Sequence, residues 1–300
     1  MNVFQEKLQQ HHSQVFTVDA LLHRSRTALQ DVLVFENRLF GRVLALDDVV
    51  QLTERDHHIY HELIVHVPLM AHGSARRVLI VGGGDGGALR EVLKHPVEKA
   101  VLVEIDGDVI EIAKRFFPDV SCGAFEDPRA RIIIGDGLDY VATTDETFDV
   151  MIVDSTDPIG PGEKLFSAQF YERCRHLLRP GGILTLQSGA SFYQSEQLDG
   201  VCSRVASSFA AVRPFLAPVP AYPGGMLALI AAGQSRRTLC PAARLLKARH
   251  AALRAGTRYY TPDVHRAAFT LPPRFAPAAA REAPAGPARP WGDGPHGRLN

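Results

Sequence analysis

Several features are scarce or absent in this 300-residue chain, and each excludes a class of protein. The four cysteines are scattered, without a C-x-x-C pair or metal-ligand spacing, so neither a disulfide scaffold nor a bound metal is expected. No apolar run reaches membrane-spanning length, and no basic start followed by an apolar stretch opens the chain. We therefore expect a cytoplasmic protein that does not insert into membranes.

An excess of charge of either sign is also absent, because 33 basic residues balance 33 acidic ones. This balance gives no electrostatic case for binding nucleic acid or an anionic membrane surface. The charge is nevertheless unevenly distributed, with 18 acidic against 8 basic residues in 82–165 and 12 basic against 3 acidic in 236–300. We interpret the basic segment as solvated surface, whereas the acidic segment is either solvated surface or the site of a cationic substrate.

The hydrophobic pattern changes near residue 71, which predicts two kinds of structure. Before it, short alternating segments at 14–22, 31–36, 39–46 and 49–52 predict a small antiparallel β-domain, and Thr53 is the expected N-cap of a helix that runs to Pro68. After it, continuous apolar runs separated by amphipathic segments predict a parallel sheet covered by helices. The expected strands are 78–81, 100–105, 131–134, 149–153 and 182–187, with edge strands at 212–217 and 226–231.

The fold class is therefore α/β, with a small antiparallel β-domain and linking helix at 1–70 and a Rossmann-like domain at 71–275. Residues 276–300 are rich in proline, alanine and glycine and have little to bury, so we expect this tail to be disordered.

A glycine-rich loop follows the first strand of the larger domain and contains an acid. Gly82, Gly84 and Gly87 have the G-x-G-x-x-G spacing that usually brings backbone close to a pyrophosphate. Asp85 lies inside this loop, and its carboxylate would repel phosphate. The loop therefore predicts a nucleoside site whose ligand carries a sulfonium or ammonium near the glycines.

Acids also follow the next three strands, at the sheet edge where ligands of α/β proteins bind. Glu104 lies twenty residues beyond Gly84, the offset of a ribose hydroxyl acceptor. Asp136 with Gly137 either contacts an adenine amino group or forms an ordinary turn. Asp154 and Asp157 lie three residues apart on a proline-stiffened loop, where they act as a base or cation anchor, or else form an Asx-turn and helix cap.

The chemistry that fits these acids is attack by an amine on a carbon activated by a sulfonium. An alkyl ammonium has a pKa of about 10, so only about one molecule in a thousand is nucleophilic at neutral pH. A positioned carboxylate that holds the amine and then accepts its proton addresses this shortage.

At these residues the sequence resembles the spermidine synthase family of polyamine aminopropyltransferases. The resemblance runs from about residue 16 to about residue 275 and rests on eight motifs: QDVLVFEN at 30–37, FGRVLALD at 40–47, VQLTERD at 50–56, IYHE at 59–62, GGGDGG at 82–87, VEID at 103–106, GDG at 135–137 and DSTDPIGP at 154–161. It implies a methyltransferase-type Rossmann-like domain and aminopropyl transfer from decarboxylated S-adenosylmethionine to putrescine, with no bound cofactor.

The resemblance also implies roles for individual residues. Asp154 is similar to the family's proton acceptor, and the residues around the diamine are Tyr60, Asp154, Ser155, Thr156, Asp157 and Tyr222. The contacts to the donor nucleoside are Gln30, His61, Asp85, Glu104, Asp136, Gly137 and Pro161, with Asp85 taking the aminopropyl ammonium. Intact S-adenosylmethionine would bring its α-carboxylate towards Asp85, a like-charge clash. Members of the family are often dimers or tetramers, which implies a homo-oligomer.

Two departures from the family bear on substrate fit. His57 and His58 occupy positions where relatives often carry Glu-Phe or similar, and Pro223 follows Tyr222. Two histidines at i, i+4, His57 and His61, can also bind metal, but the next histidine is one residue too late for H-E-x-x-H. A polar helix face or a ligand contact is the favoured interpretation, and no metal is expected.

Other functions compatible with these residues are an S-adenosylmethionine-dependent diamine N-methyltransferase, an NAD-dependent dehydrogenase and a silent polyamine-binding protein. The dehydrogenase would have to tolerate Asp85 beside a pyrophosphate, and the presence of both Asp154 and Asp157 argues against a decayed site. The acceptor remains open among putrescine, cadaverine and spermidine, because a pocket distinguishes one methylene by only about 1–3 kcal/mol.

Overall fold

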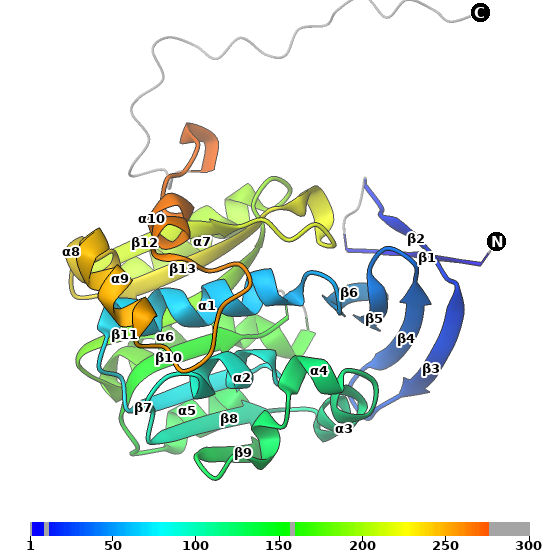
Figure 1. Cartoon of the computed structure of the whole chain (residues 1–300), viewed down its shortest axis with the longest axis horizontal. Helices are drawn as coiled ribbons and strands as arrows, with labels where there is room; N and C mark the ends of the chain where they lie inside the picture. The colour runs from blue at the N-terminus through cyan, green and yellow to red at the C-terminus, as the bar shows by residue number, and fades with distance from the viewer. Residues whose placement is uncertain (1, 9–11, 157–159, 276–300) are drawn as a thin grey trace, which may run out of the picture.

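The computed structural model describes residues 2–8, 12–156 and 160–275, and its strands form one large and two small sheets (Figure 1). The N-terminal part pairs β1 (Val3–Gln5) with β2 (Val15–Thr17) and builds a four-stranded antiparallel sheet in sequence order. Its strands are β3 (Ala20–Arg26), β4 (Asp31–Asn37), β5 (Gly41–Leu46) and β6 (Val49–Thr53). The predicted strand at 14–22 is two strands, because β2 pairs with β1 whereas β3 pairs with β4.

The seven-stranded sheet has the order β12-β13-β11-β10-β7-β8-β9. Its strands are β7 (Arg77–Gly82), β8 (Lys99–Glu104), β9 (Ala130–Ile134), β10 (Phe148–Asp154), β11 (Leu178–Ala190), β12 (Ala211–Ala217) and β13 (Leu227–Gly233). The central strands are parallel, as predicted, but β13 runs antiparallel to both of its neighbours. Only nine residues connect β12 to β13, fewer than a parallel crossover needs.

Helices cover both faces of this sheet, which explains why its strands are apolar throughout. On one face, Val78 and Ile80 of β7 belong to a buried cluster to which α1 (His57–His72), α2 (Gly87–Leu93), α8 (Arg236–Leu239), α9 (Ala243–Ala251) and α10 (Pro262–Ala268) also contribute side chains. Leu79 and Val81 point to the other face, towards α5 (Gly137–Thr143), α6 (Ala168–Leu177) and α7 (Ser195–Ala206). Both clusters of side chains are almost fully buried.

The remaining helical segments lie in the connections. They are α3 (Gly107–Phe116), α4 (Pro118–Ser121) and the 3₁₀ turns η1 (Ala124–Glu126), η2 (Gly160–Phe166), η3 (Pro223–Gly225) and η4 (Pro273–Phe275). No helix in the described ranges is long and apolar enough to cross a membrane.

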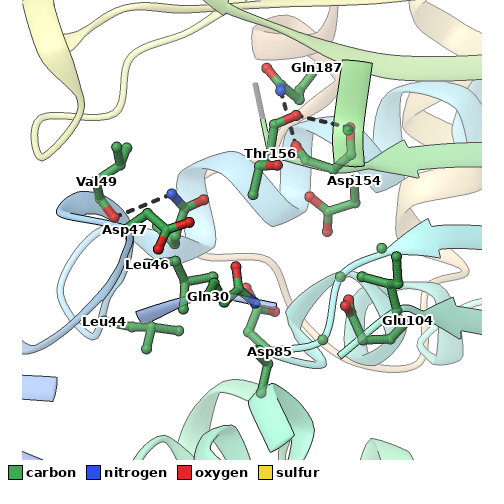
Figure 2. Close-up of a pocket in the computed structure, with 18 of the residues that line it drawn as sticks. Gln30, Leu44, Leu46, Asp47, Val49, Asp85, Glu104, Asp154, Thr156 and Gln187 are labelled. Atoms are coloured by element: carbon green, nitrogen blue, oxygen red, sulfur yellow. Dashed lines mark hydrogen bonds between the residues drawn. The ribbon is translucent and has the colours of Figure 1, made fainter. Parts of the chain in front are cut away.

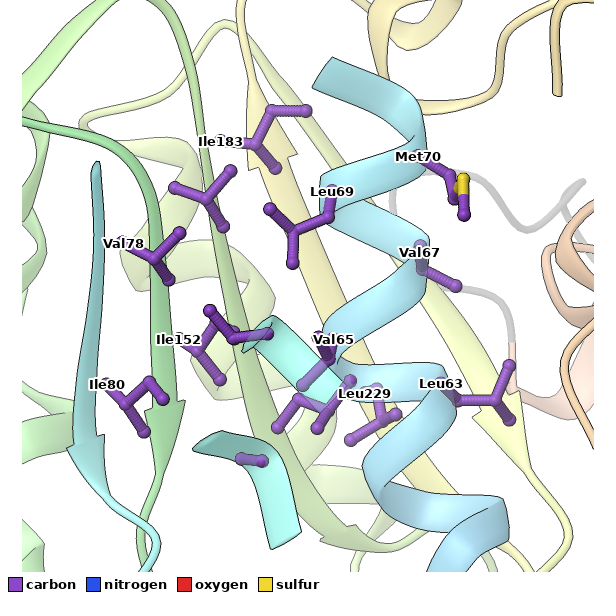
Figure 3. Packing of buried hydrophobic residues seen from close by; sticks show 14 of the residues in the cluster. Leu63, Val65, Val67, Leu69, Met70, Val78, Ile80, Ile152, Ile183 and Leu229 are labelled. Carbon is purple, nitrogen blue, oxygen red and sulfur yellow. The ribbon is translucent and has the colours of Figure 1, made fainter. Parts of the chain in front are cut away.

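Helix α1 links the two parts of the chain and packs on the larger sheet through Val65 and Leu69, while Leu63, Val67 and Met70 are buried on its other side (Figure 3). Two details of its prediction are wrong. The helix passes through Pro68 and ends before Gly73, and Thr53 belongs to β6 instead of capping the helix. The Thr53 hydroxyl donates to Asp56 Oδ1 at 2.6 Å, so these two side chains join β6 to the start of α1. This bond fixes the entry of α1 beside the carboxyl edge of the sheet.

Candidate active site

A cavity of about 470 Å³ lies at the carboxyl edge of the central strands. The floor comes from the ends of β7, β8 and β10, and the opposite wall comes from the β5–β6 hairpin of the N-terminal sheet (Figure 2). Lys7 is the only lysine or arginine among the described residues that line it, and its ammonium pairs with Asp48 at 2.6 Å. Four carboxylates at the carboxyl ends of strands of the seven-stranded sheet line the same cavity, namely Asp85, Glu104, Asp136 and Asp154.

The glycine loop is shaped by close backbone contacts at two positions. Gly82 has φ +84°, and a Cβ there would overlap the carbonyl oxygen of Asp154 on the neighbouring strand. A Cβ on Gly87, the first residue of α2, would overlap the imidazole of His61. Glycine at these two positions lets the loop pack directly against β10 and α1, since any side chain there would overlap them.

Asp85 is held from two sides at the start of α2. Its Oδ1 accepts the Gly87 N–H at 2.6 Å, and its Oδ2 lies 3.3 Å from His61 Nε2. Burial raises the pKa of Asp85, but the charge and hydrogen bond of His61 and the Gly87 N–H outweigh burial and lower it below its usual value. Asp85 is therefore a fixed anion in the wall of the cavity.

Asp154 ends β10 and is fixed by one hydrogen bond. The Tyr60 hydroxyl of α1 donates to Asp154 Oδ1 at 2.5 Å, while the buried Oδ2 has no hydrogen-bond partner among the described residues. Burial, followed by the charge of Asp85, raises the pKa of Asp154 to about 6. With this pKa the carboxylate is mostly ionised at neutral pH, and its uncommitted oxygen can accept a proton from a bound group.

Glu104 ends β8 and packs against the glycine loop. Its Oε1 accepts the Asp106 N–H at 3.0 Å, and a Cβ on Gly84 would lie only 2.9 Å from its Oε2. Burial raises the pKa of Glu104 to about 7. Gln30 lies near it because its amide donates to Asp106 Oδ2 at 2.9 Å, a bond that ties the N-terminal sheet to the start of α3.

Asp136 serves the fold as well as the cavity. Its Oδ1 accepts the Leu138 N–H at 2.7 Å and caps α5, with Gly137 as the first helical residue. Asp136 therefore caps a helix and also lines the cavity. Its second oxygen accepts no hydrogen bond from the described residues.

The residues after β10 are tied to a neighbouring strand. Gln187 of β11 donates to the Ser155 carbonyl oxygen at 3.0 Å, and Gln187 itself accepts the Gly189 N–H at 2.7 Å within a β-bulge. Figure 2 shows Gln187 beside Thr156 and Asp154 at the upper end of the cavity. This arrangement fixes the loop that carries the proposed acceptor contacts.

The structure brings most of the predicted site residues into this one cavity. Lining it are Gln30, Tyr60, Asp85, Glu104, Asp136, Gly137, Asp154, Ser155, Thr156 and Tyr222. His61 is 2% exposed and lies behind Asp85 instead of lining the cavity. Asp157 lies outside the described residues, and Pro161 belongs to η2 without a described side chain.

The wall contributed by the N-terminal sheet, β11 and β13 was not predicted from the sequence. Gln51 accepts the Tyr222 hydroxyl through its carbonyl oxygen at 2.8 Å and lines the cavity together with Leu44, Leu46, Asp47, Val49, Gln187 and Leu227. The motifs at residues 40–47 and 50–56 include Leu44, Leu46, Asp47 and Gln51, and these motifs were the available signals. The apolar members have no chemical signature in sequence, because they look like ordinary core residues.

The two histidines at i, i+4 on α1, His57 and His61, lie in contact with each other, and His61 also contacts Asp85. His57 Nδ1 lies 3.1 Å from His61 Nδ1, and His61 Nε2 faces Asp85. Among the residues that the structure describes, no group of three or more histidine, cysteine or acidic side chains could hold a metal ion.

Two family models match the chain. The spermine/spermidine synthase domain matches residues 57–240, and the spermidine synthase tetramerisation domain matches residues 2–54. A polyamine aminopropyltransferase of Pseudomonas aeruginosa is 49% identical over 273 residues, which cover 91% of this chain and 96% of that protein. The polyamine aminopropyltransferase of a Klebsiella pneumoniae strain is 44% identical over 271 residues, covering 90% and 95%.

Solved structures show the same similarity. A spermidine synthase crystallised with the transition state analogue AdoDATO has a TM-score of 0.85 at 36% identity, with 90% of this chain and 92% of that chain covered. The spermidine synthase of Thermotoga maritima has a TM-score of 0.82 at 34% identity, with 90% and 91% covered.

Proposed function

The chain belongs to the spermidine synthase family of polyamine aminopropyltransferases, and on this premise we propose that it transfers the aminopropyl group of decarboxylated S-adenosylmethionine to putrescine. The products are spermidine and methylthioadenosine. The enzyme is a transferase, and no bound cofactor is needed because the sulfonium of the donor supplies the activation.

The observation that carries this proposal is the pairing of two differently held carboxylates in one cavity. Asp85 is kept anionic by His61 and the Gly87 N–H, whereas Asp154 has a raised pKa of about 6 and one oxygen that accepts no hydrogen bond from the described residues. A donor with an ammonium at one end and a sulfonium near its centre fits the fixed anion at Asp85. The incoming amine fits the proton acceptor at Asp154.

In the proposed reaction the amine nitrogen of putrescine attacks the aminopropyl carbon bonded to sulfur. The C–N bond forms as the C–S bond breaks, the bonding electron pair returns to sulfur, and the ammonium proton passes to Asp154 Oδ2. The acidic walls also stabilise the cationic substrates before reaction, so alignment must supply much of the acceleration. Tyr60 contributes by holding the carboxylate of Asp154 in place.

We assign the remaining cavity residues to the two substrates. Glu104 accepts from the ribose hydroxyls of the donor, and Asp136 with Gly137 and Pro161 surrounds the adenine, while Gln30 and His61 complete the donor site. The diamine lies among Tyr60, Ser155, Thr156, Asp157 and Tyr222. Tyr60 and Tyr222 support this assignment because their rings lie 6.3 Å apart beside Asp154.

The rival functions meet an electrostatic obstacle at Asp85. An S-adenosylmethionine-dependent methyltransferase would place the α-carboxylate of its donor near Asp85, and an NAD-dependent dehydrogenase would place a pyrophosphate there. Incubation with putrescine and either decarboxylated or intact S-adenosylmethionine separates these cases. We expect spermidine with the decarboxylated donor only; a methylated amine, or binding of NAD in place of methylthioadenosine, would refute the proposal.

We also propose a homo-oligomer, either a dimer or a tetramer, assembled through the N-terminal domain at residues 1–70. The match of residues 2–54 to a tetramerisation domain supports this, as do the exposed apolar side chains Val3, Val15, Leu21 and Leu39 on its strands and turn. Light scattering on the purified protein tests the proposal, and a monomer at micromolar concentration would contradict it. Assignment of residues 71–275 as the catalytic domain, and a cytoplasmic location, remain predictions.

A further inference from the structure

A chain of two imidazole rings leads away from the cavity behind Asp85. His57 is the first residue of α1 and is 6% exposed, and it does not line the cavity. Its Nδ1 lies 3.1 Å from His61 Nδ1, and His61 Nε2 lies 3.3 Å from Asp85 Oδ2. His57 therefore touches the proposed donor site only through His61.

The short contact between the two rings restricts where the protons can lie. An ionised carboxylate only accepts hydrogen bonds, so His61 Nε2 carries a proton towards Asp85. Of the two facing Nδ1 atoms, one must donate and the other accept. Two arrangements satisfy this condition: neutral His61 accepts from His57 Nδ1–H, or cationic His61 donates its Nδ1–H to neutral His57.

The surrounding charges decide which arrangement is favoured before the donor binds. Burial lowers the pKa of His61, but the charge and hydrogen bond of Asp85, followed by the charges of Asp154 and Glu91, raise it above its usual value. Burial and the charge of His61 lower the pKa of His57 to about 3, against the opposing charge of Asp85 and with small additions from His58 and Arg90. These opposite shifts favour a cationic His61 beside a neutral His57 over the reverse assignment of charge.

The proposed donor brings a second cation to the same carboxylate. Its alkyl ammonium, with an ordinary pKa of about 10, stays charged throughout the physiological range. With the ammonium at Asp85, the carboxylate faces two cations, and their repulsion favours loss of the His61 proton. Methylthioadenosine lacks the ammonium and exerts no such repulsion.

We propose that His57 is a positioning residue that allows His61 to lose its proton when the ammonium of the donor binds at Asp85. The inference rests on the proposed function. The proton leaves His61 Nδ1 for His57 Nδ1 while His57 releases its Nε2 proton to water, so both rings end neutral. Asp85 then directs its full negative charge to the ligand.

This mechanism fixes the sign of a pH dependence. The donor binds the deprotonated form of His61 more tightly, so its affinity rises with pH until His61 is neutral in the free enzyme. Asp154 and Glu104 also titrate in this range, with pKa values of about 6 and about 7. Any test must therefore separate their protons from that of His61.

The experiment measures proton release by calorimetry in buffers of different ionisation enthalpy between pH 6 and 8. Decarboxylated S-adenosylmethionine is compared with methylthioadenosine, which shares the ribose that we place at Glu104. All measurements are repeated in an Asp154→Asn background to remove the proton of Asp154. We expect the donor to release up to about one proton more than methylthioadenosine when His61 is protonated in the free enzyme.

Two substitutions of His57 provide the matched pair. The amide of His57→Gln can donate to or accept from His61 Nδ1, so it supports both charge states and should retain the additional proton release. The carboxylate of His57→Glu only accepts and holds His61 as a cation, so the additional release should fall to less than about a third.

Equal proton release with both ligands in the wild type, or release by His57→Glu equal to that of the wild type, would overturn the role of His57. The wild-type comparison decides the matter even if a variant misfolds, because it needs no substitution. A failure of the proposed function looks different: the decarboxylated donor would neither bind nor yield spermidine with putrescine.

Discussion

Replacing Asp154 by asparagine tests the centre of the proposed mechanism. The asparagine side chain has nearly the same volume, and its carbonyl oxygen can still accept the Tyr60 hydroxyl that now lies 2.5 Å from Asp154 Oδ1. It cannot accept a proton from the attacking amine. The substitution therefore removes the base while keeping the shape of the cavity.

The size of the effect follows from the two pKa values involved. The ammonium of a diamine has a pKa of about 10, whereas burial and Asp85 place that of Asp154 at about 6. Complete proton transfer before attack would cost about 5.5 kcal/mol, so transfer must accompany formation of the C–N bond. A positioned base of this kind contributes about 10²–10⁴-fold. We expect Asp154→Asn to reduce kcat by that factor, which corresponds to about 3–5.5 kcal/mol of barrier.

The assay is spermidine formation at saturating donor, with methylthioadenosine affinity as the control. Affinity for methylthioadenosine should change by less than about threefold, or under 1 kcal/mol, because the proposed mechanism assigns Asp154 to the amine and not to the nucleoside. In the wild type, kcat/KM for putrescine should fall as the pH drops through the pKa of Asp154, and this acid limb should be absent from Asp154→Asn. Tyr60→Phe provides a second check. The Tyr60 hydrogen bond lowers the pKa of Asp154, so Tyr60→Phe should raise this pKa and move the acid limb to higher pH. Retention of more than about a tenth of the turnover by Asp154→Asn, or persistence of its acid limb, would refute the assignment of the base.

Three further substitutions probe the donor site and the fold. Glu104→Gln should raise the donor KM about 10- to 100-fold with little change in kcat, and an unchanged KM would contradict a ribose contact. In the wild type, protonation of Glu104 should weaken donor binding below about pH 7. This pH dependence should be absent from Glu104→Gln. Gly87→Ala drives a methyl group into the His61 ring and should lower the free energy of unfolding by about 1–3 kcal/mol in denaturant titrations, whereas wild-type stability would show that the ring moves freely. Burial raises the pKa of Glu91, but the hydrogen bond and charge of His66 outweigh burial and lower this pKa from 4.5 to about 2. Ionised Glu91 therefore stabilises the fold above about pH 4.5, and this contribution is lost as the pH falls towards 2. Glu91→Gln should flatten that part of the stability curve, and an unchanged curve would show that the pairing contributes nothing.

Much of the larger domain was predictable because burial on both faces leaves a strong local signal. The expected strands at 78–81 and 149–153 correspond to β7 and β10 within one or two residues. The direction of β13 was not predictable from its own residues, since an apolar run looks the same in either orientation. The start of α1 was missed for a related reason: the Thr53 hydroxyl, a good N-cap by type, is used to join β6 to Asp56.

The candidate site also contains some residues that were predictable from sequence and others that were not. Asp85, Glu104, Asp136 and Asp154 were identifiable because each follows a strand, and parallel strands bring such positions to one edge. Gln187 carries no comparable signal, and its place in the cavity depends on a bulge in β11 and on the neighbouring loop.

The sequence by itself determined the order of strands and helices, the glycine loop and the acids that follow the strands, because these depend on local periodicity and on the steric needs of single residues. Only the tertiary structure decided that the carboxylates differ in state. Asp85 is anionic because α1 places His61 behind it, and Asp154 has a raised pKa because packing removes water and places the charge of Asp85 nearby. A pKa depends on the distances to groups far away in the chain, and those distances exist only after folding.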